Sequence, residues 1–173
     1  QLYNTADSII VGNFLGSNAL AAVGSSGSPI YLLIGFSQGI AVGAGVVVAQ
    51  YLGAKDRKDA QDAIHTSLAI AVILGILLTI GGILFSRSLL VWMNTPDEVF
   101  GDVSAYMGII YAGLLVTGAY NTLAAFLRAL GDSKSPLYFL IISAVINIIL
   151  DIVFIVYLGM GVEGCGYATV IAQ

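Results

Sequence analysis

Long apolar blocks dominate this chain of 173 residues, and they restrict it to a narrow class of folds. Hydrophobic residues make up 58% of the sequence and charged residues only 9%, whereas soluble domains carry about 25% charged residues. Blocks near 20 residues match the length that an α-helix needs to cross a hydrocarbon core about 30 Å thick. We therefore expect an all-α, polytopic membrane helix bundle.

The pattern predicts five transmembrane helices and the start of a sixth. The second is expected to begin at Pro29, because proline suits the first turn of a helix. Short linkers make consecutive helices antiparallel neighbours. The chain begins with Gln1 instead of methionine, so we interpret it as an internal fragment of a longer protein. The expected spans are residues 1–15, 29–51, 67–85, 103–127, 136–158 and 164–173.

The positive charges predict how the bundle is oriented. Five of the six Lys and Arg residues fall in two loops, residues 53–62 and 128–135, while Arg87 lies apart from them. Cytoplasmic loops carry an excess of positive charge, so these two loops are expected to face the cytoplasm of a cell (plasma or inner) membrane. The opposite loops are acidic and contain Asp97, Glu98, Asp102 and Glu163.

Two aspartates, Asp7 and Asp151, lie inside otherwise apolar spans. A carboxylate at the centre of a membrane helix costs roughly 3 kcal/mol or more. Such residues usually line a polar cavity and handle a cation or a proton. The alternative is a structural network in which each carboxylate is bonded to neighbouring polar groups.

The predicted topology places both aspartates at a similar depth. At 1.5 Å per residue, Asp7 lies about 12 Å and Asp151 about 10 Å below the outer ends of their helices, with Thr169 about 8 Å down. Tyr3 precedes Asp7, and Asn147 precedes Asp151, by one helical turn. If these faces converge, their oxygens suit a small hard cation such as Na⁺. Two close carboxylates cannot both ionise comfortably, so the pair also suits a proton.

Other polar or small residues in the spans leave two interpretations open. Gln38 and Asn121 either line a substrate cavity or bond to a neighbouring helix. The glycines at 35, 39 and 43 form a small-residue face on the second span, which either packs against a neighbouring backbone or lets the helix slide or bend. Cys165 is interpreted as a small residue in a tight turn.

Four motifs in order resemble the multidrug and toxic compound extrusion (MATE) family. The first resembles that family's first helix and external loop, the second the cytoplasmic end of its helix two, the third its helix four-to-five loop and the fourth its helix five. These motifs are YNTADSIIVG (3–12) with LGSNALAAVG (15–24), QYLGAKD (50–56), LRALGDSKSP (127–136) and NIILDIVF (147–154).

The resemblance implies an antiporter that exports organic compounds, often cationic and drug-like, by using a Na⁺ or H⁺ gradient. The family fold has twelve helices in two lobes, so this chain resembles most of the N-terminal lobe, and its partners would be the C-terminal lobe, membrane lipid and a small organic substrate. Similarity to the DinF-type branch implies a coupling site formed by Asp7, Asn147, Asp151, Thr169 and Tyr3.

Three competing functions are weighed against antiport. A lipid-linked oligosaccharide flippase of the same superfamily needs cationic groups to hold pyrophosphate, and no Lys or Arg lies within a span interior. An intramembrane aspartyl protease needs signatures that are not present around Asp7 and Asp151. A purely structural subunit would not need two carboxylates at one depth. We expect no enzyme activity, no cofactor beyond the coupling ion, no further metal site and no nucleic-acid partner.

Overall fold

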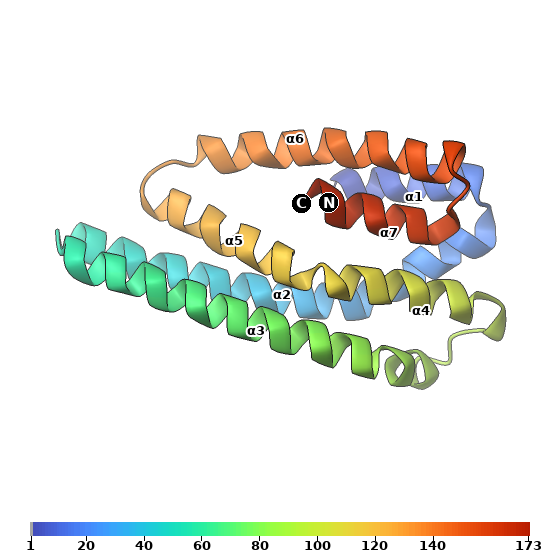
Figure 1. Cartoon of the computed structure of the whole chain (residues 1–173), viewed down its shortest axis with the longest axis horizontal. Helices are drawn as coiled ribbons and strands as arrows, with labels where there is room; N and C mark the ends of the chain where they lie inside the picture. Colours follow the sequence, from blue (N-terminus) through green and yellow to red (C-terminus); the bar gives the residue numbers. More distant parts are fainter. Residues whose placement is uncertain (1) are drawn as a thin grey trace.

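The computed structural model describes residues 2–173, with side chains from Asp7 onwards. Every element in this part of the chain is helical, which confirms the expected all-α class (Figure 1). The elements are α1 (Leu2–Phe14), α2 (Ser17–Gly53), α3 (Arg57–Trp92), α4 (Asp97–Ala112), α5 (Leu114–Ala129), α6 (Lys134–Asp151), a π-helical segment η1 (Ile152–Tyr157) and α7 (Gly161–Ala172).

Among the described residues, three helical segments are long and apolar enough to cross a membrane: α2, α3 and α6 continued by η1. Helices α4 and α5 qualify together as a fourth span, bent by 44° at a break of one residue, Gly113. Helices α1 and α7, with 13 and 12 residues, are shorter than a full span. The membrane limits of the six expected spans stay a prediction.

The expected start of a helix at Pro29 is wrong, because α2 already begins at Ser17 and runs through the proline. Two serines in the preceding turn bond to backbone carbonyls: Ser25 Oγ donates to Ala21 O and Ser26 Oγ to Val23 O, both at 2.8 Å. The carbonyl that Pro29 leaves without its helical donor is Ser25 O, and these two serine hydroxyls bond to other carbonyls. The proline therefore lies within a longer helix.

The helices form two groups around α4 and α5. Figure 1 shows α2 and α3 side by side along one side, α6 with α1 and α7 along the other, and the bent α4–α5 pair between them. The buried core lies mainly where α4 meets its neighbours. It includes Val11, Leu90, Val103, Met107, Tyr111, Leu114 and Cys165.

Close glycine contacts hold α2 and α3 against the α4–α5 pair. A Cβ at Gly45 would lie 3.1 Å from Ala125 Cβ, and one at Gly82 would lie 2.9 Å from Tyr111 Cγ. These distances leave no room for a side chain without movement of the neighbour. By contrast, a Cβ at residue 35, 39 or 43 would meet nothing within 4 Å, so that predicted packing face makes no such contact with the described helices.

Candidate functional site

Asp7 and Asp151 meet in the interior of the bundle. One carboxylate oxygen of each lies within 4.8 Å of the other, and Cys165 Sγ lies within the same limit of both. The aspartates are almost fully buried, with 2% and 0% of their surfaces exposed. The expectation that the two carboxyls lie within about 10 Å is confirmed.

The local helix geometry explains how these groups come together. Asp151 is the last residue of α6 and directly precedes η1. A π-helical turn is rare and is frequently found at functional sites. Helix α7 approaches this turn closely, since a Cβ at Gly164 would lie 3.1 Å from Phe154 Cβ. The absence of a side chain at Gly164 therefore lets α7 bring Cys165 beside the aspartate.

Asn147 and Thr169 surround the two carboxyls, as the sequence predicts. Both interact with the Asp7 side chain, which also faces Asp151. Asn147 Nδ2 lies 3.4 Å from Thr169 Oγ1, and the Thr169 hydroxyl donates to Cys165 O at 3.0 Å. We call Asp7, Asn147, Asp151 and Thr169 the carboxylate cluster. The side chain of the fifth predicted member, Tyr3, lies outside the described residues.

Several oxygens of the carboxylate cluster are left without hydrogen-bond donors. Asp7 Oδ1, Asn147 Oδ1 and both oxygens of Asp151 are buried and have no partner with hydrogen-bond geometry. A buried charge or polar group without a partner is costly. Bare, converging oxygens are the ligands that a small hard cation or a proton requires. The donor set therefore fits either form of the predicted coupling ion.

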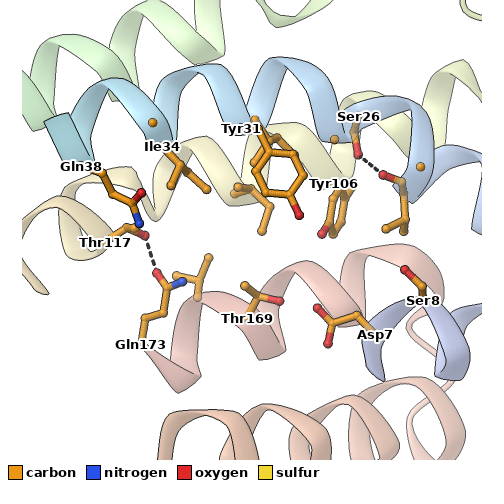
Figure 2. A pocket seen from close by; sticks show the side chains of 17 residues that line it. Asp7, Ser8, Ser26, Tyr31, Ile34, Gln38, Tyr106, Thr117, Thr169 and Gln173 are labelled. Atoms are coloured by element: carbon orange, nitrogen blue, oxygen red, sulfur yellow. Dashed lines mark hydrogen bonds between the residues drawn. The ribbon is translucent and has the colours of Figure 1, made fainter. Parts of the chain in front are cut away.

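A cavity of about 390 Å³ borders one side of the cluster. Figure 2 shows the Asp7 carboxylate and the Thr169 hydroxyl on one wall, facing Tyr31 and Tyr106. The expectation that both aspartates line one cavity is wrong in this respect: Asp7 lines the cavity, whereas Asp151 lies behind it and is fully buried. Asp7 thus lies at the cavity wall, and Asp151 lies deeper in the protein interior.

The two predicted cavity residues occupy different places. Gln38 lines the same cavity as Asp7, at the end beside Thr117 (Figure 2), and also a second cavity of about 860 Å³, whereas Asn121 lines the second and not the first, together with Arg128. Gln38 therefore shares a cavity with Asp7 without adjoining the carboxylate cluster, and Asn121 is not part of that site. No Lys or Arg is present among the described residues that line the first cavity.

Sequence reasoning missed several polar residues of the site. Ser26 and Thr117 line the first cavity with Gln173, whose Oε1 accepts a hydrogen bond from Thr117 Oγ1 (Figure 2). Cys165 is buried in the core instead of being only a small turn residue. Its spacing of four residues from Thr169 placed both on one face of a helix, which was the available signal.

Comparisons with known proteins agree with this architecture. The MatE family model matches residues 1–153. The chain is 38% identical over 168 residues to the Probable multidrug resistance protein YoeA of Bacillus subtilis, covering 94% of this chain and 36% of that protein. It therefore spans little more than a third of the length of this relative.

Solved structures of transporters share the fold. One is described as the inward-facing conformation of a multidrug resistance MATE family transporter of the MOP superfamily, with a TM-score of 0.92 and 33% identity over 99% of this chain and 39% of that one. The outward-facing conformation of such a transporter gives a TM-score of 0.93 and 32% identity, over 99% of this chain and 38% of that one. Members of this family are multi-pass membrane transporters and not enzymes. The family match and the shared fold show that the chain belongs to the MATE family, as part of its N-terminal lobe.

Proposed function

We propose that the full-length protein is a secondary active antiporter that exports organic, drug-like and often cationic compounds in exchange for inward movement of Na⁺ or H⁺. One observation carries this proposal. Asp7 and Asp151 form a buried pair with unpartnered oxygens, and Asp7 also lines a cavity. The same carboxylate is therefore available to the coupling ion and to a substrate.

This shared position suggests how the ion and the substrate influence each other. A cation or proton on the carboxylate cluster neutralises the charge that Asp7 presents to the cavity. A cationic substrate is attracted by the charged form and is less favoured by the neutral form. Two ligands that favour opposite states of one site are linked by a coupling free energy, which is what antiport requires.

The other lobe is needed for transport. Alternating access occurs when two halves rock around a central site, and this chain supplies one half. It matches inward-facing and outward-facing transporter structures about equally well, with TM-scores of 0.92 and 0.93. This agreement supports movement of the lobe largely as one body, with the cluster and the first cavity carried along in it.

Flux measurements on the full-length protein in proteoliposomes test the proposal. A Na⁺ gradient or a H⁺ gradient is imposed separately, and movement of a cationic dye against its own gradient is followed. We expect dye accumulation with at least one gradient and none when both are collapsed. Accumulation that does not depend on either gradient would contradict antiport. Movement of a lipid-linked pyrophosphate without any ion requirement would favour the flippase, although the first cavity offers no described Lys or Arg for its phosphates.

A further inference from the structure

We propose that Asp7, Asp151 and Cys165 together form a binding site for a divalent, thiophilic metal ion of the Zn²⁺ class. The site is distinct in chemistry from a Na⁺ or H⁺ site, because it adds a sulfur donor to two carboxylates. Bound metal would occupy oxygens of the carboxylate cluster and prevent their use by the coupling ion. That inhibitory consequence rests on the proposed function, whereas metal binding itself does not.

The ligand atoms of this triad, Asp7, Asp151 and Cys165, are near enough to be compared with those of a zinc site. One oxygen of each aspartate and Cys165 Sγ all lie within 4.8 Å of one another. With bonds of about 2.1 Å to oxygen and 2.3 Å to sulfur, tetrahedral ligands are separated by roughly 3.4–3.6 Å. The three atoms therefore need to approach by no more than about 1.4 Å to reach these separations.

The donor types select the class of metal. Na⁺, Mg²⁺ and Ca²⁺ prefer oxygen ligands, so the thiol adds nothing to their binding. Zn²⁺ and Cd²⁺ bind thiolate strongly and also accept carboxylate oxygens. A divalent ion offsets two of the three negative charges that the ionised aspartates and the Cys165 thiolate bring to the site. On binding, the Cys165 thiol loses its proton to bulk solvent, and a metal–sulfur bond replaces the S–H bond.

Buried polar groups that lack a fully formed hydrogen bond also point to a ligand. Both oxygens of Asp151, a residue with no exposed surface, form no hydrogen bond of full geometry, although the carboxyl interacts with Asp7 and Cys165. Asn147 Oδ1 is also buried and unpartnered, and the Asn147 side chain interacts with Asp7. It is available as the fourth ligand of a tetrahedral ion. Asp7 lines the first cavity, which provides a path for the metal.

Cadmium binding to the purified full-length protein tests the site directly. Cd²⁺ is the probe, because a cadmium–thiolate bond gives a charge-transfer absorption in the ultraviolet. Wild type is titrated beside Cys165→Ser, which keeps a side chain of similar size without the soft donor. The difference between the two titrations reports this cysteine even if other cysteines are present. We expect Cys165→Ser to lose the cadmium–thiolate absorption that corresponds to one bound Cd²⁺ per protein.

Asp7→Asn and Asp151→Asn show whether the carboxylates share the metal. We expect each to weaken the Cys165-dependent signal at least tenfold, as for loss of a direct ligand, and thermal melts establish that the variants are folded. Glu163→Gln is the matched control, because this exposed acid lies two residues before Cys165 outside the triad. Identical titrations of wild type and Cys165→Ser would overturn the site. A Cys165 signal that is insensitive to both aspartate variants would also overturn it.

Transport measurements separate this inference from the proposed function. Zn²⁺ should reduce dye efflux by wild type, and Cys165→Ser should resist that inhibition when each protein is compared with its own metal-free rate. If the cadmium signal appears as expected but both aspartate variants transport normally, the metal site stands and the proposed coupling role fails. If transport requires both aspartates but no Cys165-dependent signal appears, the coupling role stands and the metal site fails.

Discussion

Helices α2 and α3 pack against α4–α5 through glycines, whereas α1, α6 and α7 meet around buried carboxylates. On the glycine-packed side, defined by Gly45, Gly75 and Gly82, backbones or side chains of neighbouring helices approach where a Cβ would collide. On the other side, oxygens of the carboxylate cluster are buried without donors. Close glycine contacts also occur on the carboxylate side, at Gly164 and Gly166 of α7, so both sides share the close packing that favours stability in a membrane. The carboxylate side differs because it also keeps costly groups, which is expected where an ion must bind and leave.

The largest effect on stability is expected from Gly82→Ala. The added Cβ would lie 2.9 Å from Cγ of the Tyr111 ring, and overpacking of this kind typically costs about 1–3 kcal/mol. Gly81→Ala is the matched control on the same helix, because its Cβ would meet nothing within 4 Å. Alanine there should be neutral or stabilising by up to about 1 kcal/mol. If the thermal melts of the two full-length variants coincide, the glycine contacts do not hold this side together.

A smaller effect is expected from Gln38→Leu, which changes the cavity wall without touching the aspartates. If Gln38 donates or accepts one hydrogen bond with the substrate, its loss costs about 0.5–1.5 kcal/mol and raises the KM for dye roughly 2- to 12-fold. Asn121→Leu is the control, since Asn121 lines only the second cavity. Equal changes in KM for the two variants would remove the distinction between the cavities.

The smallest effect concerns the loop between α5 and α6. Asp132 accepts hydrogen bonds from Ser135 Oγ at 2.6 Å and from the backbone N–H groups of Lys134 and Ser135. The Ser135 hydroxyl and these amides hold the pKa of Asp132 below its ordinary value of 3.8. A carboxyl with a depressed folded pKa stabilises the fold above its unfolded pKa, and this contribution is lost as pH falls through the folded value.

Hydrogen exchange of the Lys134 and Ser135 amides checks this pH dependence. Their protection should be present above pH 3.8 and should decline below it in wild type, after correction for intrinsic exchange. Asp132→Asn should lack that decline, because asparagine does not titrate in this range. The same decline in both proteins would assign it to another group.

The sequence predicted the convergence of Asp7 and Asp151 because depth along a helix follows from residue count and topology. It also identified Asn147 and Thr169, whose spacing and resemblance to the MATE family placed them near the pair. Depth does not give the rotation of a helix about its own axis. For that reason the sequence did not distinguish Asp7 on the cavity wall from Asp151 behind it.

Rotation and local backbone geometry also explain the remaining misses. The π-helical turn after Asp151 changes which residues share a face, and no residue in IVFIVY signals such a turn. Pro29 indicated a helix start, but the hydrogen bonds of Ser25 and Ser26 accompany a helix that continues through it. The glycines that flank Cys165 favour a turn, yet in α7 they allow the close approach that buries this residue.

The glycine-packed side and the carboxylate cluster differ in function only if the carboxylates bind the coupling ion. Asp7→Asn and Asp151→Asn keep the shape of each side chain and remove its charge. If the carboxylate cluster couples ion to substrate, each full-length variant should lose efflux of a cationic dye from cells. Its thermal melt should equal or exceed that of wild type, because a buried charge has been removed. Asp102→Asn is the control, since Asp102 is an exposed acid on α4, and its efflux should match wild type.

Efflux by Asp7→Asn and Asp151→Asn, measured beside the melts, is therefore the most direct test of the account. Loss of efflux with unchanged or increased melting temperature is the predicted result. Normal efflux in both variants would contradict it, and the carboxylate cluster would then be a structural network like the glycine-packed side.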